Sequence, residues 1–522
     1  MSRALSTGQI LRKPAVHSAG GAVVSQNRIA SEIGAEVLRD GGNAVDAAVA
    51  MSFALGVVEP WMSGIGGGGY MIIRHASDTG AQVVDFGMRS PAELNVADYP
   101  IVGGASSDLF PWPNVKDNAN VFGARAVAIP GVVAGMDLAH RTWGTRPWAD
   151  LLVPAIAEAQ AGLEVDWYAQ LVIASVAPVL AQYPASRATF LDAQGFPKSS
   201  AWTALGETRC DMSALAATLS RIAEAGPDDF YRGTLAAQLV GDLRAAGGRH
   251  SAKDFAQYQA RILPASESRY RRHRMFSTPE LTAGPTMEHV LSLLERWQPM
   301  GTAPDAQAYI AYDKAIRTAN AQRLSTMGDV EAEPAYSCTT HFNVVDADGT
   351  TVAVTQTLLS MFGSRLMLPG SGVLMNNGVM WFDPEQGRPN SIGPAKRCLS
   401  NMVPTLLERS DGRRIALGGA GGRKIMPTVA QLVSFLLDYD MDIETAMHTP
   451  RIDASMSDVT IADSALPSDI ITALKASLPT VVAAPRTAYP FNFACPGIAE
   501  RDAQNASAVA ETMAPWAEAV AV

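Results

Sequence analysis

The sequence predicts a protein of the mixed α/β (α+β) class, with a layered core of sheets and helices. Three observations support this prediction. The first 95 residues are rich in helix starts and stops, and about residues 130–330 read mainly as helix. From Tyr336 onward, β-branched runs predominate instead. With 522 residues, the chain can form one large domain or two to three smaller ones.

Two helices are expected near the beginning of the chain. An apolar stripe at helical spacing predicts the first over residues 27–40, and Gly41 and Gly42 follow as stop signals. Asn43 can cap a second helix over Ala44–Val58, where the residues are small and apolar. This composition indicates that the second helix is buried.

A glycine-rich loop comes next, followed by two strands at residues 70–74 and 83–87. The loop, residues 64–69, formally matches G-x-G-x-x-G, and Asp85 lies 16 residues further on. A dinucleotide site requires a strand before the loop and a helix after it. Here a helix precedes the loop and a β-branched run follows it, so we interpret the loop as a closely packed backbone turn.

The strand-rich later part begins with a β-hairpin. Two β-rich runs flank Asp348-Gly349, a strong turn signal. Another strand is expected at residues 414–417, and it leads into the glycine cluster GGAGG. A helix over residues 427–438 should follow that cluster.

Composition argues against several classes of function. The 41 Lys and Arg against 51 Asp and Glu give a net charge of −10, which disfavours nucleic-acid binding. Four scattered cysteines without a C-x-x-C pair predict neither a disulfide scaffold nor a zinc site. The first 21 residues have no apolar core of about 7–15 residues, so we expect no secretory signal. The longest uncharged stretch, residues 167–186, contains two Gln and two Pro, so we expect a cytoplasmic protein without a membrane span. No cofactor or metal is expected.

Candidate nucleophiles are hard to identify from residue type alone. A Ser-His-Asp arrangement cannot be judged by counting, but the G-x-S-x-G elbow is absent from the sequence. Thr339, in the run CTTHF at the start of the hairpin, is a stronger candidate. Threonine favours strands, however, so the residue type by itself indicates a structural role.

Six blocks of sequence, in order, resemble the γ-glutamyltransferase family of N-terminal-nucleophile hydrolases. The blocks are residues 41–71, 128–136, 339–358, 370–377, 394–405 and 417–429. The resemblance extends over nearly the whole chain. It implies the four-layer αββα sandwich typical of such hydrolases.

The resemblance also implies self-cleavage. A threonine hydroxyl attacks the preceding carbonyl, and hydrolysis of the resulting ester leaves that threonine as a new N-terminus. The bond would be Cys338–Thr339, giving chains of residues 1–338 and 339–522 that form one intertwined domain. The new α-amine, with an ordinary pKa of about 7.7–8.0, can accept the hydroxyl proton of Thr339.

Three further catalytic residues follow from matching the family motifs. Thr357 would lie beside the nucleophile as a hydrogen-bond partner. Gly421 and Gly422 match the glycines whose backbone N–H groups receive the oxyanion. By itself, GGAGG reads as a tight turn between a strand and a helix.

The amine-binding positions of the family have changed. The family binds the substrate amine with Asn, Gln and Asp, and Leu359, Gly378 and Trp381 stand at those places. Each has lost its polar acceptor, so a substrate ammonium would be poorly solvated there. We therefore expect substrates that lack an α-amino group.

The carboxylate side is partly retained. Gly87 replaces the family arginine, but Arg89 is two residues away and Arg365 is an added cation. Ser400 and Asn401 match the Ser-Ser pair that contacts the carboxylate. Arginine can bind a carboxylate through two hydrogen bonds, although Arg89 and Arg365 could equally form surface salt bridges. The segment 382–392 is short, which indicates an open site.

These features predict a self-processing amidohydrolase. Its substrates would be small acidic amides of the oxamate-like or glutaryl type. Its partners would be its own two cleavage fragments, which could oligomerise further. One alternative is a γ-glutamyltransferase or glutathione hydrolase that acts on γ-glutamyl amides. Another is an uncleaved, inactive binding homologue. Neither the leaving amine nor the role of Cys338 follows from the sequence.

Overall fold

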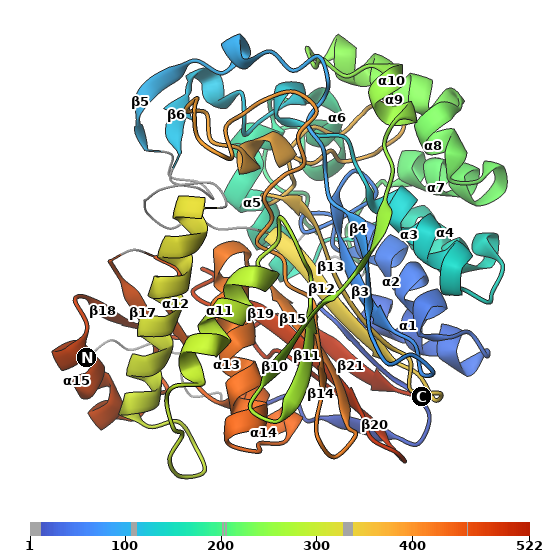
Figure 1. Cartoon of the computed structure of the whole chain (residues 1–522). Helices are drawn as coiled ribbons and strands as arrows, with labels where there is room; N and C mark the ends of the chain where they lie inside the picture. Colours follow the sequence, from blue (N-terminus) through green and yellow to red (C-terminus); the bar gives the residue numbers. More distant parts are fainter. Residues whose placement is uncertain (1–11, 106–111, 201–202, 204–205, 327–337, 457) are drawn as a thin grey trace.

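Two seven-stranded antiparallel sheets pack face to face and form the centre of the protein (Figure 1). The computed structural model describes residues 12–105, 112–200, 203, 206–326, 338–456 and 458–522. We call the sheet that contains β12 sheet 1, and the sheet that contains β15 sheet 2. Helices cover the outer face of each sheet, giving the predicted αββα sandwich.

The strands of each sheet are given in their spatial order. Sheet 1 consists of β21 (Glu518–Ala521), β2 (Ala22–Ser25), β12 (Cys338–Val345), β13 (Thr351–Leu359), β3 (Gly68–Arg74), β4 (Gln82–Phe86) and β9 (Arg261–Pro264). Sheet 2 consists of β1 (Val16–Ser18), β20 (Ala506–Ala510), β19 (Cys495–Arg501), β15 (Arg414–Ala420), β14 (Thr405–Glu408), β11 (His273–Ser277) and β10 (Ser266–Tyr270). Smaller sheets join β5 (Ile101–Ala105) to β6 (Pro113–Val115), β7 (Leu163–Glu164) to β8 (Arg209–Cys210), and β16 (Ile452–Asp453) to β17 (Thr460–Asp463) and β18 (Val481–Ala484).

The helices fall into two groups. The group on the side of sheet 1 comprises α1 (Arg28–Arg39), α2 (Ala44–Val58), α3 (Val132–Trp143), α4 (Trp148–Ala161), α5 (Trp167–Leu180), α6 (Pro184–Phe190), α7 (Ser213–Ala225), α8 (Asp228–Arg232), α9 (Thr234–Ala245) and α10 (Ala252–Ala256). The group on sheet 2 comprises α11 (Gly284–Leu294), α12 (Ala306–Thr326), α13 (Ile425–Asp438), α14 (Ile443–His448) and α15 (Ser468–Ser477). Within the described residues, no helix is long and apolar enough to cross a membrane.

Both faces of each sheet are buried, one under helices and the other against the second sheet, so the core consists of separate layers. Apolar residues of α1–α4 pack on the outer face of sheet 1, and those of α11–α13 pack on sheet 2. Between the sheets, one apolar cluster includes Tyr70, Phe276 and Ala416. A second joins Val24 to Ala499. Burial on this scale provides the main stabilisation of such a fold.

The predicted helices and hairpin are confirmed. The side chain of Asn43 accepts hydrogen bonds from the backbone of Val45 and Asp46, and it closes a capping box with Asp46. The hairpin strands β12 and β13 pair antiparallel around the expected turn. Tyr336, where the strand-rich part of the chain was predicted to begin, lies outside the described residues. The prediction of a mainly helical middle was incomplete, because β9, β10 and β11 lie within it.

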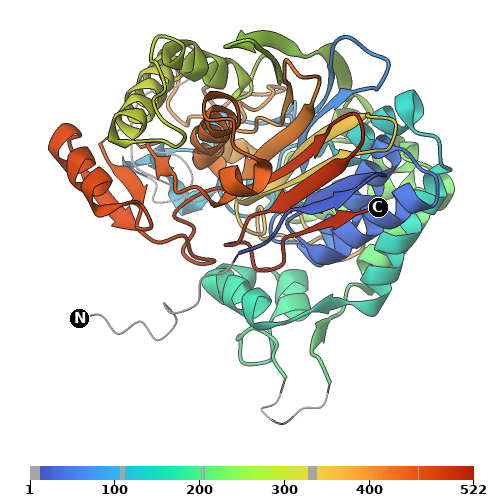
Figure 2. The ribbon, with the colours of Figure 1, turned by 90° about the horizontal axis from the view of Figure 1, so that it is seen from below.

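Each sheet combines strands from both sides of Cys338. In sheet 1, β2 lies between β21 and β12, so a strand from the start of the chain is flanked by strands from later parts. Figure 2 shows these red and blue segments side by side. In sheet 2, β1, β10 and β11 come from before Cys338, and the other strands come from after it. The two parts of the chain therefore share both sheets.

Candidate active site

Two threonine hydroxyls meet at the start of β12. Thr339 Oγ1 lies 3.3 Å from Thr357 Oγ1 on the neighbouring strand, and both side chains are buried. The ladder is irregular here, since Cys338 pairs with Leu359 whereas Thr340 pairs with Gln356. The backbone N–H of Leu359 also donates to Thr357 Oγ1 at 2.8 Å. These contacts hold the two hydroxyls that were predicted as nucleophile and partner in one place.

The glycine loop of residues 64–69 packs directly behind this pair. A Cβ on Gly67 would lie 2.2 Å from the carbonyl oxygen of Thr357, and one on Gly66 would lie 2.2 Å from that of Leu374. No side chain fits at either position. The interpretation of the loop as a closely packed turn is confirmed, and β3 follows it where a dinucleotide site requires a helix.

The predicted oxyanion glycines come from sheet 2. Arg414 Nη1, at the start of β15, donates to the carbonyl of Gly349 in the hairpin turn. Further along β15, a Cβ on Gly418 would lie 2.3 Å from the His341 ring. Strand β15 therefore runs across β12 toward Thr339, and Gly421 follows its end.

Gly421 and Gly422 have backbone conformations that favour glycine, with φ values of 132° and 61°. They lead into a 3₁₀ turn, Gly422–Lys424, and then into α13. The first N–H groups of a helix have no partners within it and are suited to an anion. The geometry is thus compatible with the predicted oxyanion role, which stays a prediction.

His341 was not among the predicted site residues, although it lies two residues from Thr339. Its Nδ1 is 2.9 Å from Thr355 Oγ1, and its Nε2 is 3.0 Å from Asn343 Oδ1. Burial lowers the pKa of His341 to about 3, so the ring is neutral at ordinary pH. Both hydrogen-bond partners of the ring belong to sheet 1, and the ring packs against Gly418 of sheet 2, so His341 has a structural role.

Glu59 is a second residue that the sequence did not single out. It follows α2 and is buried, and its Oε2 accepts a hydrogen bond from Thr340 Oγ1 at 3.1 Å. Burial raises the pKa of Glu59 to about 8, while the Thr340 hydrogen bond opposes that rise. The carboxyl is therefore mostly protonated at neutral pH. Its position beside Thr340 could have been noticed only once the fold was known.

The three altered amine positions are all buried. Leu359 and Trp381 belong to one apolar cluster between the sheets. A Cβ on Gly378 would lie 2.8 Å from the Cβ of Ala128, so no longer side chain fits there. The indole N–H of Trp381 has no hydrogen-bond partner among the described residues. None of the three side chains can accept a hydrogen bond from an ammonium group.

The two predicted carboxylate-binding arginines make other contacts. Arg89 Nε donates to the carbonyl of Ala395 at 3.0 Å. Arg365 Nη1 donates to the carbonyl of Gly363 at 2.7 Å, and its guanidinium lies 4.7 Å from the centre of the Phe122 ring. Their roles toward a substrate stay predictions.

At Gly87 there is no room for the family arginine. A Cβ there would lie 2.8 Å from the Tyr70 hydroxyl and 3.1 Å from Asp85 Oδ1. Asp85 in turn forms ion pairs with Arg261 at 2.7 Å and with Arg397 at 3.2 Å. Tyr70 and Asp85 therefore occupy the space beside Gly87, and the charge of Asp85 is already paired with two arginines.

Ser400 and Asn401 differ in their surroundings. Ser400 is buried, its hydroxyl accepts from the backbone of Met402, and its carbonyl accepts from Arg323 Nη2 at 2.8 Å. Asn401 is half-buried, and its side chain has no hydrogen-bond partner among the described residues. Neither Arg323 nor Arg423, which directly follows Gly422, was among the predicted site residues.

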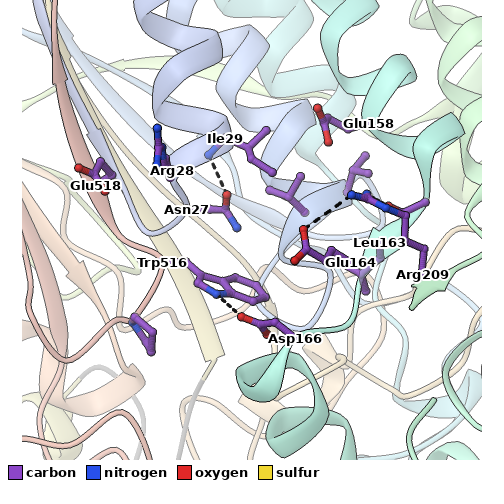
Figure 3. Close-up of a pocket in the computed structure, with 14 residues that line it drawn as sticks. Asn27, Arg28, Ile29, Glu158, Leu163, Glu164, Asp166, Arg209, Trp516 and Glu518 are labelled. Atoms are coloured by element: carbon purple, nitrogen blue, oxygen red, sulfur yellow. Dashed lines mark hydrogen bonds and ion pairs between the residues drawn. The ribbon is translucent and has the colours of Figure 1, made fainter. Parts of the chain in front are cut away.

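A pocket lies between several elements of the protein (Figure 3). It has a volume of about 350 Å³ and is lined by the starts of α1 and α5 and by Trp516. The Trp516 indole donates to Asp166 Oδ2 at 2.6 Å, as Figure 3 shows. No predicted site residue lines it. Across the described part of the chain, no group of three or more His, Cys, Asp or Glu side chains could hold a metal ion.

Comparison with known proteins gives consistent results. The family model described as gamma-glutamyltranspeptidase matches residues 30–338 and 330–519. The chain is 32% identical to the acylase ACY 1 proenzyme of Pseudomonas sp. (strain SE83), covering 92% of this chain and 90% of the relative. It is 30% identical to the glutathione hydrolase proenzyme of Bacillus subtilis (strain 168), covering 87% and 84%.

A solved structure has the same fold over the full length. The cephalosporin acylase from Bacillus halodurans superposes with a TM-score of 0.86, at 21% identity, over 100% of this chain and 99% of that one. At this identity, the likeness concerns the fold alone.

Proposed function

The chain belongs to the gamma-glutamyltranspeptidase family of N-terminal-nucleophile amidohydrolases, and from this premise we propose a self-processing enzyme that hydrolyses amides of short acids lacking an α-amino group. The observation that carries the proposal is the pair of hydroxyls of Thr339 and Thr357, 3.3 Å apart at the start of β12. The glycines predicted to bind the oxyanion, Gly421 and Gly422, directly follow β15 of sheet 2 and have backbone conformations that favour glycine. Active-site geometry of this kind supports acyl transfer.

Maturation would begin at the Cys338–Thr339 bond. Thr339 Oγ1 attacks the carbonyl carbon of Cys338, the peptide C–N bond breaks, and the nitrogen of Thr339 gains the proton that the hydroxyl loses. Water then hydrolyses the new ester, which restores the hydroxyl and leaves a carboxylate on Cys338. The products are chains of 338 and 184 residues. The sharing of both sheets by strands from the two parts supports their remaining together as one domain.

The same hydroxyl would perform turnover. The freed α-amine of Thr339 takes the hydroxyl proton as Oγ1 attacks the substrate carbonyl, and it then gives that proton to the leaving amine. The backbone N–H groups of Gly421 and Gly422 would bind the oxyanion. Water attacks the acyl ester and releases the acid. This scheme needs no histidine base. His341 is neutral and hydrogen-bonded at both ring nitrogens, which is consistent with the scheme.

The altered amine positions support an amine-free acyl group. A substrate ammonium beside Leu359, Gly378 and Trp381 would lose its hydration without gaining hydrogen-bond acceptors. Burying a charge without a partner costs on the order of several kcal/mol of binding free energy. Oxamate-like or glutaryl-type amides avoid that cost. The acylase relative is compatible with such a substrate.

A γ-glutamyl substrate is the second candidate, because the glutathione hydrolase proenzyme is nearly as similar as the acylase. Parallel assays with glutaryl-p-nitroanilide and γ-glutamyl-p-nitroanilide separate the two, since these compounds differ only in the α-amino group. The proposal predicts a higher kcat/KM for the glutaryl compound. A preference for the γ-glutamyl compound would refute the argument from the amine positions.

Mass spectrometry of the denatured wild-type and Thr339→Ala proteins tests self-processing. We expect two wild-type fragments, the smaller beginning at Thr339, and an uncut 55.2 kDa chain in the variant. Thr339→Ser, which keeps a hydroxyl, is the matched control and should still be cut. A single uncut wild-type chain without amidase activity would instead indicate the inactive binding homologue.

A further inference from the structure

We propose that the pocket shown in Figure 3 binds a small organic ammonium compound that also carries a hydrogen-bond acceptor, such as a hydroxyl group. Among the described residues, none of those predicted for catalysis or for substrate binding lines this pocket. The inference therefore goes beyond the proposed function, and it does not depend on whether the chain is cut.

The size of the pocket and its apolar lining suit a small organic molecule. Its volume is about 350 Å³, and sites for small molecules usually have volumes of about 300–1,000 Å³. The buried side chains of Val57, Val58 and Leu163 supply apolar lining. Ile29 and Pro515 add further apolar surface. The apolar body of a ligand would therefore lose contact with water on binding here.

Trp516 adds an aromatic surface whose position is already fixed. Its indole N–H donates to Asp166 Oδ2 at 2.6 Å. Its ring contacts Tyr168 edge to face, with the ring centres 5.4 Å apart, and its centre lies 5.3 Å from that of Trp61. The face of a tryptophan ring attracts cations. Because the side chain is already held, it can bind an ammonium group with little further loss of conformational entropy.

Carboxylates outnumber cations in the lining of the pocket. Four acidic residues and two arginines line it: Glu158, Glu164, Asp166 and Glu518, with Arg28 and Arg209. Arg28 pairs with Glu32 at 2.7 Å. Arg209 pairs with Glu207 at 2.9 Å and with Glu164 at 3.7 Å, and Figure 3 shows the second of these ion pairs. Neither Glu32 nor Glu207 lines the pocket, so the positive charges of the lining are compensated from outside it.

Three of the four carboxylates form no ion pair within the described part of the chain. Glu158 is half-buried on α4, and its carboxylate has no hydrogen-bond partner among the described residues either. Asp166 accepts hydrogen bonds from three N–H groups, and none of these carries a charge. Glu518 acts on Arg28 and on the half-buried Lys13 from beyond ion-pair distance. The pocket therefore has negative charge that is only partly compensated, and this charge would attract an ammonium group.

Asn27 supplies a hydrogen-bond donor to the pocket. The residue is only 5% exposed, and its Oδ1 caps α1 by accepting from the backbone of Ile29 at 3.0 Å. This bond fixes the orientation of the amide, and Figure 3 shows the amide nitrogen pointing toward the space between Trp516 and Glu164. Among the described residues, no acceptor binds this nitrogen. A buried amide donor of this kind predicts an acceptor on the ligand.

The pocket lies between the two parts of the chain that meet at Cys338. Pro515, Trp516 and Glu518 come after Cys338, and the other lining residues come before it. A bound compound would contact both parts at once. It should therefore raise the apparent melting temperature of the protein, whether or not the Cys338–Thr339 bond is cut.

Calorimetric titrations of the purified full-length protein with three compounds test the proposal. Phenylalaninol has an aromatic body, an ammonium group and a hydroxyl group, and it contains no amide bond that could be hydrolysed. We expect it to bind at least about tenfold more tightly than 3-phenylpropan-1-ol, which lacks the amine. The compound 2-phenylethylamine lacks the hydroxyl group. It should bind about three- to tenfold more weakly than phenylalaninol, because it cannot accept a hydrogen bond from Asn27.

Two variants and a matched control locate the binding. Glu158→Gln keeps the shape of the side chain without its charge, so it should weaken phenylalaninol binding about three- to fivefold and leave 3-phenylpropan-1-ol unchanged. Asn27→Ser keeps an oxygen that can cap α1 but lacks the amide donor. It should bind phenylalaninol no more tightly than 2-phenylethylamine. Glu36→Gln is the control, because Glu36 is exposed on α1 and does not line the pocket, and its affinities should equal those of the wild type.

Three results would overturn the proposal. The first is that phenylalaninol does not bind at millimolar concentrations. The second is that phenylalaninol and 3-phenylpropan-1-ol bind with equal affinity, since the pocket would then not select a cation. The third is an unchanged affinity for phenylalaninol in both Glu158→Gln and Asn27→Ser, because the compound would then bind elsewhere on the protein. Thermal melts without any compound check that each variant is folded, so that lost binding is not mistaken for lost structure.

Discussion

The imidazole ring of His341 rests on the backbone of Gly418, with its Cε1 atom 2.3 Å from where a Cβ on that glycine would stand. This contact joins β12, which contains Thr339, to β15, which ends directly before Gly421. The predicted nucleophile lies on sheet 1 and the predicted oxyanion glycines follow a strand of sheet 2, so their spacing depends on how closely the sheets pack. His341 and Gly418 set that spacing.

Gly418→Ala should therefore impair both stability and maturation. Inserting a methyl group into a packed core typically costs about 1–3 kcal/mol, and here it would also push β15 away from β12. We expect a lower unfolding midpoint in urea and slower appearance of the 184-residue fragment. Gly419→Ala is the control, since its nearest neighbour would lie 3.3 Å away. Equal effects of the two variants would contradict the proposed role of the His341 contact.

The glycine loop provides a second prediction. Gly67→Ala would place a methyl group 2.2 Å from the carbonyl oxygen of Thr357, whose backbone cannot move without disturbing its hydroxyl. We expect a loss of about 3 kcal/mol or more in unfolding free energy, or failure to fold. At Gly80 an added Cβ meets nothing within 4 Å, so Gly80→Ala should stay within about 0.5 kcal/mol of the wild type. Urea titrations measure both.

Thr357 should matter through its hydroxyl. It receives hydrogen bonds from Thr339 Oγ1 and from the backbone of Leu359. Thr357→Val keeps the shape of the side chain but leaves that N–H without its acceptor, and we expect turnover to fall at least about tenfold. Thr357→Ser, which keeps the oxygen, should stay within a few-fold of the wild type. Similar rates for the valine and serine variants would show that the hydroxyl pair is not needed.

Glu59 should make the stability of the protein depend on pH. Its pKa is about 8 in the folded protein and lies near 4.5 ordinarily, so the folded state binds the proton more tightly than the unfolded state. The stabilisation is fully present below about pH 4.5, declines as the pH rises, and is lost above about pH 8. Thermal melts of wild type and Glu59→Gln across this range test the prediction. The melting temperature of Glu59→Gln should lack this decline, so the variant should gain stability relative to the wild type as the pH rises toward 8. A difference in melting temperature that does not change with pH would contradict the prediction.

Local signals made much of the fold predictable. Asn43 and the paired glycines before it define the junction between α1 and α2, and Asp348-Gly349 defines the β12–β13 turn. The strands β9, β10 and β11 were missed, because their arginine- and serine-rich segments lack clear alternation. Strands β9 and β11 depend on pairing with β4 and β14, which are distant in the sequence, and β10 forms a hairpin with β11.

The candidate site was predictable only where a motif carried it. Thr339, Thr357, Gly421 and Gly422 lie in blocks that resemble the family, and the structure brings the hydroxyls of Thr339 and Thr357 together. Glu59 and His341 are inside those blocks, yet their importance depends on contacts across strands and sheets. Burial and pairing of this kind arise from tertiary structure, and no spacing along the chain encodes them.

Because each sheet contains strands from both sides of Cys338, cleavage of the Cys338–Thr339 bond changes the kinetic order of folding. If the chain is cut at that bond, unfolding releases two separate molecules, and refolding becomes a second-order reaction between them. The uncut Thr339→Ala chain would refold by a first-order process. Dilution should therefore lower the apparent melting temperature of the cut protein and leave that of the uncut variant unchanged. Once cut, the enzyme would be maintained by slow unfolding rather than by its capacity to fold again.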